Sequence, residues 1–164
     1  GVKMTGWVTL GEQKFYYEPA NGGVMSRGWY SDAAGRFYFL DLTDGHMLTG
    51  DQVIDGSKYL FTPEGVRMTG MVAREDGSYY YDPATGAMLT GWFDADNKTY
   101  YADPQGHIVT GVYEIEKQPY YFDAAGALVR SGEVELEGTL YTTTQEGILV
   151  QVEAAMAGEE EKTQ

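Results

Sequence analysis

Short apolar segments alternate with polar, glycine-containing turns at a nearly constant interval along this chain. A closing glycine ends each turn that leads into a new apolar segment, and this set is Gly6, Gly28, Gly50, Gly70, Gly91, Gly111 and Gly132. Successive closing glycines are 22, 22, 20, 21, 20 and 21 residues apart. An inner set recurs with the same period, at Gly22, Gly45, Gly65, Gly86, Gly106, Gly126 and Gly147. Such regular spacing predicts a repeat protein of about seven units, the last one degenerate.

Each unit has the pattern of a β-hairpin. A short run follows the closing glycine, turn-forming residues come next, and a second run rich in aromatic side chains follows. The turn formers include Asp55-Gly56, Asp76-Gly77, Asp96-Asn97 and Glu137-Gly138. Residues of this kind accept the positive φ angles of a type I′ turn, so each pair of runs is predicted to form two antiparallel strands.

The hairpins must pack on one another, because an isolated hairpin of this length is marginal in water. Stacking of neighbours then supplies the core, as in other repeat proteins. We expect an all-β chain, an elongated β-solenoid of about seven stacked β-hairpin repeats of 20–22 residues, covering residues 1–150. Residues 151–164 are expected to form a terminal cap and an acidic, disordered tail. An internal column is expected from Met25, Met47, Met68, Met88, Ile108 and Leu128.

Composition and charge exclude several classes of partner. The chain has 11 Lys and Arg residues against 25 Asp and Glu residues, a formal net charge of −14 at pH 7. This balance repels phosphate backbones and anionic lipids, so no nucleic acid is expected as a partner. There is no cysteine and no apolar stretch of about 18 residues, so neither disulfides nor membrane insertion is expected.

The sequence offers no catalytic constellation, and we expect neither an enzyme nor a bound cofactor. His46 and His107 follow the inner glycine in repeats three units apart, so they do not share a metal in an extended array. The run from Asp94 to Asn97 lacks the following glycine and the distant glutamate of a calcium loop. No metal site is predicted.

The repeated order of Gly-Trp, hairpin turn, aromatic run, turn glycine, Met and Thr-Gly resembles the choline-binding or cell-wall-binding repeat of Gram-positive surface proteins. The segments "FYYEPANGGVMSRGW" and "YYYDPATGAMLTGW" carry the likeness, which extends from residue 1 to about residue 150. Glucan-binding repeats of glucansucrases and repeats of clostridial toxins are related. The resemblance implies a left-handed superhelix with ligand sites between consecutive repeats, where three aromatic side chains enclose the quaternary ammonium of choline.

Only part of each implied aromatic site is present. The Gly-Trp tryptophan occurs as Trp7, Trp29 and Trp92, while Asp51, Met71, Val112 and Glu133 take its place elsewhere. The tryptophan expected on the second strand is absent from every repeat, and only Phe37 keeps an aromatic ring there. The position aligns, within one residue, with Lys14, Phe37, Lys58, Ser78, Thr99, Pro119 and Leu140. The ligand-binding residues predicted by this resemblance are Trp29 with Phe37 and Tyr59, Trp92 with Tyr120 or Tyr121, and Trp7 with Tyr38 near Lys14. Loss of one ring from a cage weakens choline binding by about tenfold or more.

Three readings of these aromatic residues stay open. The first is a non-catalytic surface-attachment module that binds cell-wall choline or carbohydrate; sugars stack on flat rings while Asp94, Asp96, Asn97 and Gln118 bond hydroxyls. The second is a structural spacer or adhesin stalk with degenerate, non-binding repeats. In the third, most tyrosines only pack between repeats. The expected partner is a choline-bearing cell-wall polymer or a glycan.

The resemblance also implies where the protein works. We expect it to be secreted and cell-wall associated, in a Gram-positive organism. The abrupt start "GVKMTGW" indicates a piece of a longer chain, with its export signal outside this segment. Relatives dimerise through terminal repeats, which makes a homodimer of this kind a further expectation.

Overall fold

The computed structural model describes residues 1–153, and all regular structure in that range is β. Residues 154–164, which include most of the predicted tail, lie outside the described residues. The all-β class is therefore confirmed for the described part of the chain. No helix in it is long and apolar enough to cross a membrane. By contact density the chain divides into two compact units, Gly1–Leu89 and Thr90–Gln164, and each is described by itself.

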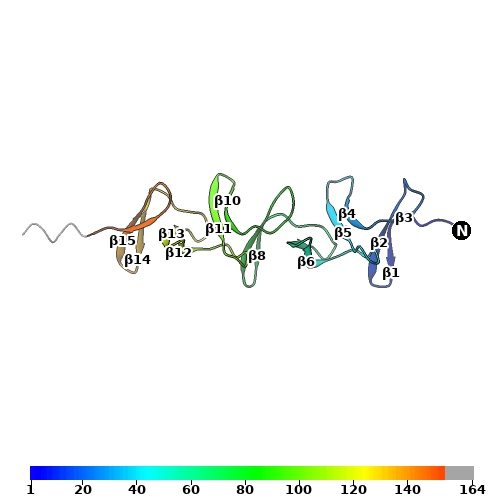
Figure 1. The fold of residues 1–164 in the computed structure, drawn as a ribbon, viewed down its shortest axis with the longest axis horizontal. Coiled ribbons are helices and arrows are strands. Elements are labelled where there is room, and N and C mark those ends of the chain that lie inside the picture. The colour runs from blue at the N-terminus through cyan, green and yellow to red at the C-terminus, as the bar shows by residue number, and fades with distance from the viewer. Residues whose placement is uncertain (154–164) are drawn as a thin grey trace, which may run out of the picture. The chain divides into compact units, whose positions relative to one another are not determined.

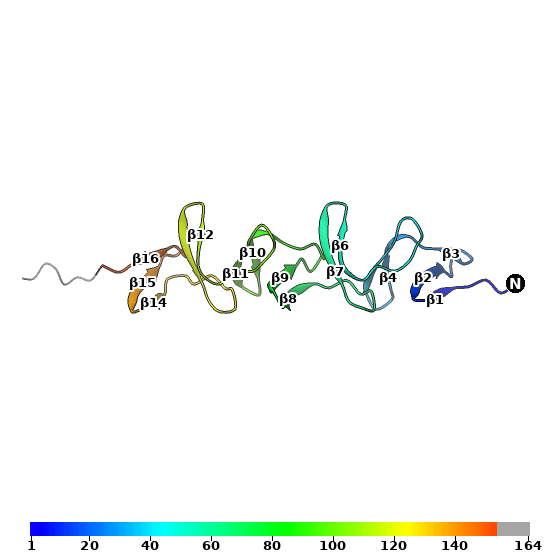
Figure 2. The ribbon, with the colours of Figure 1, turned by 90° about the horizontal axis from the view of Figure 1, so that it is seen from below.

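The first unit contains four antiparallel hairpins (Figure 1), each in a sheet of its own. Its strands are β1 (Gly6–Leu10), β2 (Gln13–Glu18), β3 (Val24–Met25), β4 (Gly28–Ser31), β5 (Phe37–Leu40), β6 (Gly50–Ile54), β7 (Ser57–Phe61), β8 (Gly70–Arg74) and β9 (Gly77–Tyr81). The hairpins are β1–β2, β4–β5, β6–β7 and β8–β9, and β3 adds a short third strand to the first. Figure 2 shows β6–β7 and β8–β9 as separate hairpins that project in different directions.

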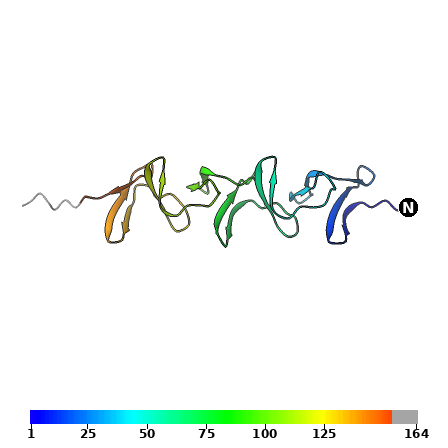
Figure 3. The ribbon, with the colours of Figure 1, turned by 60° about the horizontal axis from the view of Figure 1, so that its bottom comes forward.

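The second unit continues the pattern with three hairpins. Its strands are β10 (Gly91–Ala95), β11 (Lys98–Ala102), β12 (Gly111–Ile115), β13 (Gln118–Phe122), β14 (Glu133–Leu136), β15 (Thr139–Thr143) and β16 (Leu149–Gln151). The hairpins are β10–β11, β12–β13 and β14–β15, and β16 pairs with β15. In Figure 3, β12–β13 (yellow-green) and β14–β15 (orange) project to opposite sides. Seven hairpins are thus present in residues 1–153, as the glycine period predicts.

Three of the four predicted hairpin turns have the type I′ backbone. The Asp76-Gly77 prediction is wrong: Arg74 pairs with Gly77, so the turn residues are Glu75 and Asp76, and neither has positive φ. Both central residues have positive φ in Asp55-Gly56 (49° and 80°), Asp96-Asn97 (50° and 61°) and Glu137-Gly138 (50° and 79°). This geometry matches the right-handed twist of the two strands, so the turn and the strands favour the same register. The register in turn decides which side chains of each hairpin face the next one.

Consecutive hairpins within a unit are joined by one repeated backbone hydrogen bond. The residue two positions after the inner glycine of one repeat donates its amide N–H to a second-strand carbonyl of the repeat before it. The bonds run from Met47 to Lys14 (2.7 Å), Arg67 to Phe37 (2.7 Å), Met88 to Lys58 (2.8 Å) and Leu128 to Thr99 (2.8 Å). We call the donors, together with Met25 and Ile108 at the same place in their repeats, the column residues.

The predicted column is wrong at one position. Arg67, and not Met68, is the column residue of the third repeat, because it forms the bridge with Phe61 that Met47 forms with Leu40. The column side chain also lies against the inner glycine of the following repeat, and Arg67 lies against Gly86 in this way. Since neighbouring residues of a strand point to opposite faces, an error of one residue exchanges a thioether for a guanidinium at the junction.

The core is made where hairpins meet. The most buried large side chains of the described residues are Leu40, Phe61, Tyr81 and Phe122. Phe39 of β5 packs with Ile54 and Phe61 of the next hairpin. No two-stranded hairpin encloses such a cluster alone, so burial of apolar area depends on contact between neighbours.

We predict that an inner glycine tolerates alanine far less than a turn glycine of similar backbone angle. Gly126 has φ +86°, and a Cβ there would meet the Cγ2 of Ile108 and, at 3.3 Å, the carbonyl oxygen of Val109. Gly138 has φ +79° and nothing within 4 Å. Gly138→Ala should lose about 1–2 kcal/mol from its left-handed backbone alone. Gly126→Ala should lose about 1–3 kcal/mol more, because the column must shift.

Urea unfolding of the two variants, followed by circular dichroism, measures this difference. Equal losses would show that the column residue does not press on the inner glycine in solution.

Candidate functional site

The three tryptophans lie at the start of a hairpin and are half exposed. Trp7, Trp29 and Trp92 are the second residues of β1, β4 and β10, and their exposed fractions are 39%, 42% and 43%. Their rings are therefore neither sealed in the core nor free of contacts. A half-exposed ring of this size offers one face to the protein and the other to a ligand.

Each tryptophan ring contacts one ring of its own hairpin and two rings of the next, of which the farther ones are Tyr30 (5.7 Å between centroids), Phe61 (6.0 Å) and Phe122 (5.9 Å). The cross-strand partners on the same hairpin are Tyr16 (5.2 Å between centroids), Phe39 (5.0 Å) and Tyr101 (5.1 Å). The nearer partners from the next hairpin are Tyr38 (4.9 Å), Tyr59 (5.1 Å) and Tyr120 (5.0 Å). The planes of the second group meet the indole plane at 60–74°. Two rings at this angle form an open corner between consecutive hairpins.

The same four positions build every such junction. They are the second residue of a hairpin, the second-strand residue whose carbonyl accepts the column bond, a tyrosine of the next hairpin, and the column residue of that hairpin. We name each junction by its first residue. The sets are Trp7, Lys14, Tyr38 and Met47; Trp29, Phe37, Tyr59 and Arg67; and Trp92, Thr99, Tyr120 and Leu128. The second-strand residues are those that the sequence alignment proposes.

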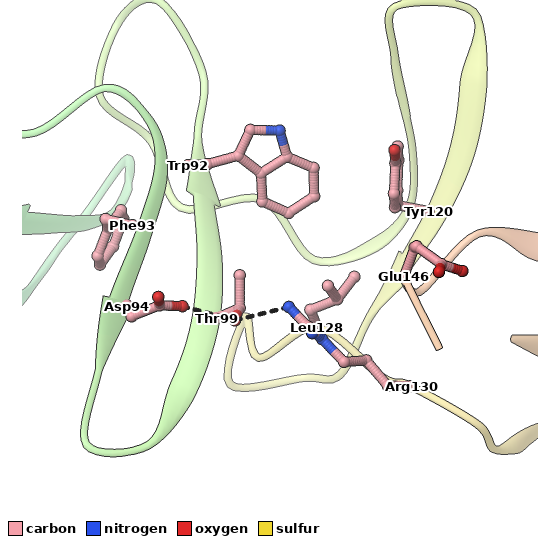
Figure 4. Close-up of a pocket in the computed structure, with 8 residues that line it drawn as sticks. All are labelled: Trp92, Phe93, Asp94, Thr99, Tyr120, Leu128, Arg130 and Glu146. Atoms are coloured by element: carbon pink, nitrogen blue, oxygen red, sulfur yellow. Dashed lines mark hydrogen bonds between the residues drawn. The ribbon is translucent and has the colours of Figure 1, made fainter. Parts of the chain in front are cut away.

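The Trp92 junction contains a pocket of about 410 Å³. Figure 4 shows Trp92 on one hairpin and Tyr120 on the next, with Leu128 below them. Asp94, Thr99, Arg130 and Glu146 complete the polar lining, while Phe93 lies on the other side of its strand. An apolar wall with a few polar groups at its edge is typical of small-molecule sites.

The polar groups of this pocket are linked to one another. The Thr99 hydroxyl donates to Asp94 Oδ1 at 2.6 Å, and Arg130 Nη2 donates to the Thr99 Oγ1 at 3.0 Å (Figure 4). Arg130 and Thr99 belong to different hairpins, so this chain of bonds crosses the junction. It holds one acceptor and one donor group at fixed positions beside the indole ring.

The Trp7 junction has a smaller pocket of about 360 Å³ with cationic side chains on its rim. Trp7, Tyr38 and Met47 supply apolar walls, and Lys14 and Arg36 also line it. Arg36 is paired with Asp32 at 2.7 Å, which neutralises part of its charge. Lys14 stands where a third ring would be, so this pocket is less suited to a cation than the ring pair alone suggests.

The Trp29 junction already holds a cation. The guanidinium carbon of Arg67 lies 4.2 Å from the Phe37 ring centroid and 5.6 Å from that of Trp29. Trp29, Phe37 and Tyr59, the most complete cage predicted from sequence, are thus brought together around a side chain of the protein. Burial lowers the pKa of Arg67 below its ordinary value, but an arginine stays charged at neutral pH.

Where tryptophan is absent, an ion pair fills the junction between β6–β7 and β8–β9. Asp51 takes the tryptophan position and binds Arg74 through two hydrogen bonds of 2.6 and 2.8 Å. These bonds hold the pKa of Asp51 below its usual value. Arg74 also lies over the Tyr79 ring, with 5.5 Å to its centroid, and burial raises the pKa of Tyr79 to about 12.

Most predicted site residues lie at junctions, but Tyr121 does not contact Trp92, and the column residues were not predicted to line the sites. Tyr120 is the ring that contacts Trp92, whereas Tyr121 is paired in register with Val112. Sequence reasoning missed Arg67 and Arg130, and it placed Met47 in the core only. Counting two residues from each inner glycine, in place of searching for methionine, would have found Arg67.

The turn after β5 gathers Asp41, Asp44 and His46, whose ligand atoms lie within 4.8 Å of one another. Asp41 Oδ1 accepts the amide N–H groups of Thr43 and Asp44, as in an Asx turn. The His46 ring contacts the Asp44 carboxylate. These groups are engaged in bonds within the turn, which accounts for their proximity.

Comparison with known families matches the central repeats. A choline-binding repeat model matches residues 48–93, and a cell wall binding repeat model matches residues 90–108. Glucosyltransferase-S from Streptococcus mutans serotype c is 34% identical over 70 residues, which are 43% of this chain and 5% of that protein.

Solved structures match over most of the chain. CbpJ from Streptococcus pneumoniae superposes with a TM-score of 0.85 at 30% identity, over 90% of this chain and 52% of that one. Choline binding protein F from the same species gives 0.81 at 31% identity with the same coverage, and one of its structures was determined with a tetrasaccharide-pentapeptide peptidoglycan analogue. This chain spans about half the length of these two solved relatives.

We predict that Tyr120, and not Tyr121, sets the environment of Trp92. In a Trp7→Phe, Trp29→Phe background, Trp92 is the sole tryptophan. Tyr120→Leu should shift its fluorescence to longer wavelength and remove about 0.5–1.5 kcal/mol of ring contact. Tyr121→Leu is the matched control and should leave the emission unchanged. A larger spectral shift for Tyr121→Leu would contradict the register of β13.

Proposed function

The chain belongs to the choline-binding and cell-wall-binding repeat family, and on this premise we propose that it is a non-catalytic surface-attachment module. Its ligand is a glycan or choline-bearing polymer of a bacterial cell wall. The contacts between hairpins are proposed to continue along residues 1–150 as one β-solenoid. The module then works outside the cell, as part of a longer, secreted protein; a homodimer through its terminal repeats stays a prediction.

The Trp92 junction is the proposed binding site, and its half-exposed indole beside Tyr120 is the observation that carries the proposal. The pocket of about 410 Å³ is large enough for one or two sugar rings. A pyranose presents an apolar C–H face that stacks on the indole. Its hydroxyl groups then meet Asp94, Glu146 and Arg130 at the rim.

Polar composition favours a glycan over choline at this site. A quaternary ammonium has no N–H group to donate, so ring faces alone hold it, at about 0.5–2 kcal/mol each. Apart from Phe93, which lies on the other side of its strand, the rings that line the pocket are Trp92 and Tyr120, and Arg130 adds a positive charge. Choline is therefore expected to bind weakly here, while a neutral sugar gains from both the ring and the hydrogen-bonding groups.

A structural spacer is the second candidate function. Four of the seven tryptophan positions hold Asp51, Met71, Val112 and Glu133, and the Asp51 position is closed by its ion pair with Arg74. Repeats without the tryptophan contribute packing between hairpins but no ligand-binding site. In a pure spacer no junction would bind ligand.

Calorimetric titration of the protein with a muropeptide, an α-glucan oligosaccharide and choline chloride tests the proposal. We expect saturable binding of at least one glycan and a weaker response to choline. Trp92→Leu should weaken the affinity for the glycan by about tenfold or more, because the stacking face is lost. Met71→Leu is the matched control, since Met71 is the second residue of β8 and is 42% exposed.

Two results would reject the proposal. If none of the three probes binds the intact, folded protein, the spacer function stands. If a glycan binds and Trp92→Leu leaves its affinity unchanged, the site lies elsewhere.

A further inference from the structure

The Trp29 junction differs from the other tryptophan junctions in the side chain that comes from the column. At the Trp7 junction this side chain is Met47, and at the Trp92 junction it is Leu128. At the Trp29 junction it is Arg67, whose charge lies over two aromatic faces. We propose that Arg67 is an internal ligand that occupies a complete aromatic cage and closes it to external quaternary ammonium compounds.

The ring geometry is that of a cation site. The guanidinium carbon is 4.2 Å from the centroid of Phe37 and 5.6 Å from that of Trp29, both within the 6 Å range of cation–π attraction. Tyr59 stands 5.1 Å from Trp29 and supplies the third ring. The junction thus has the ring that the Trp7 and Trp92 junctions lack, since Lys14 and Thr99 take the place of Phe37 there.

Hydrogen bonds hold the guanidinium in this position. Nη1 donates to the carbonyl of Thr85 at 2.7 Å, and Nη2 donates to that of Ala84 at 3.2 Å. Nε is buried and has no hydrogen-bond partner within residues 1–153. The backbone amide N–H of Arg67 donates separately to the carbonyl oxygen of Phe37. Arg67 therefore links three repeats: its guanidinium donates to carbonyl oxygens of the fourth repeat and lies over rings of the second.

An external cation must displace this internal one to enter. The fold sets a high effective concentration of the Arg67 guanidinium at the cage. Its displacement would break two hydrogen bonds to carbonyl oxygens as well as the ring contacts. A quaternary ammonium offers no donor to replace those bonds. The cage is therefore filled in the native protein, and a neutral residue in place of Arg67 should open it.

Methionine is the replacement that the fold already accepts. Met47 and Met88 occupy the same position in the repeats on either side and make the same amide hydrogen bond. Arg67→Met should keep the backbone junction while removing the charge. It leaves Trp29, Phe37 and Tyr59 as three rings around a site for a compact cation that cannot hydrogen-bond, of which choline is the simplest probe.

Titration of the whole chain with choline chloride, in a Trp7→Phe, Trp92→Phe background, tests the inference. Trp29 is then the sole tryptophan and reports only its own junction. With Arg67 present, choline should leave the emission unchanged. With Arg67→Met, a saturable change should appear at a choline concentration about tenfold or more lower than any response of the parent. Adding Phe37→Leu should abolish it, and Arg67→Lys, which keeps a charge, should not show it.

The inference fails if Arg67→Met folds, as judged by circular dichroism and thermal unfolding, yet shows no response to choline. It also fails if Arg67→Lys responds as strongly. Should Arg67→Met not fold, the Nε–Hε resonance of Arg67 in the unaltered protein decides. This resonance should stay at its ring-shifted position during choline titration, and its movement would show that choline displaces the guanidinium.

This inference shares with the proposed function the idea that ligands bind at aromatic junctions, but it does not depend on a glycan as the ligand. The readout comes from Trp29 in a background without Trp92. Failure of the glycan titration leaves the Arg67 result unaffected, and the reverse also holds.

Discussion

Burial of aromatic rings between consecutive hairpins is the interaction on which the structure depends. A two-stranded hairpin has no interior, so Phe39 and Phe61 are buried because their two hairpins cover each other. The backbone bond from a column residue to the previous repeat, made by Met47, Arg67, Met88 and Leu128, sets the spacing at which this covering occurs. Stability is then a sum over neighbour contacts, and each contact is also a place where side chains of two repeats meet at the surface.

Because the same contact recurs, a single substitution changes the chemistry of one junction and leaves the others intact. The Trp7, Trp29 and Trp92 junctions share a corner of two rings. They differ in the second-strand residue and in the column residue, which together decide whether the corner is open, charged or filled. A repeat array can therefore carry both ligand sites and closed, purely structural junctions on one backbone.

The charge of the chain is distributed unevenly with respect to these junctions. The net charge is −14, yet Lys14, Arg67, Arg74 and Arg130 all stand at aromatic junctions. Ring faces attract cations, and a cation from the same chain is always present at high local concentration. Arg67 and Arg74 thus supply cations to ring faces from within the protein. Lys14 and Arg130 line the pockets of the Trp7 and Trp92 junctions, which favours a neutral ligand there.

The period of glycines determined the number of hairpins, their all-β class and the type I′ turns at Asp55-Gly56 and Asp96-Asn97, because these follow from local backbone preferences. It also determined which tryptophans begin a hairpin, whereas the rings opposite them, Tyr16, Phe39 and Tyr101, were not among the predicted site residues. The identity of the column side chain and the contacts of Arg67 were decided only by tertiary structure. Phe37 and Arg67 are brought together by pairing between repeats, and a shift of one residue along a strand reverses the face to which a side chain points. That direction is set by non-local hydrogen bonds, which the composition of a single repeat does not contain.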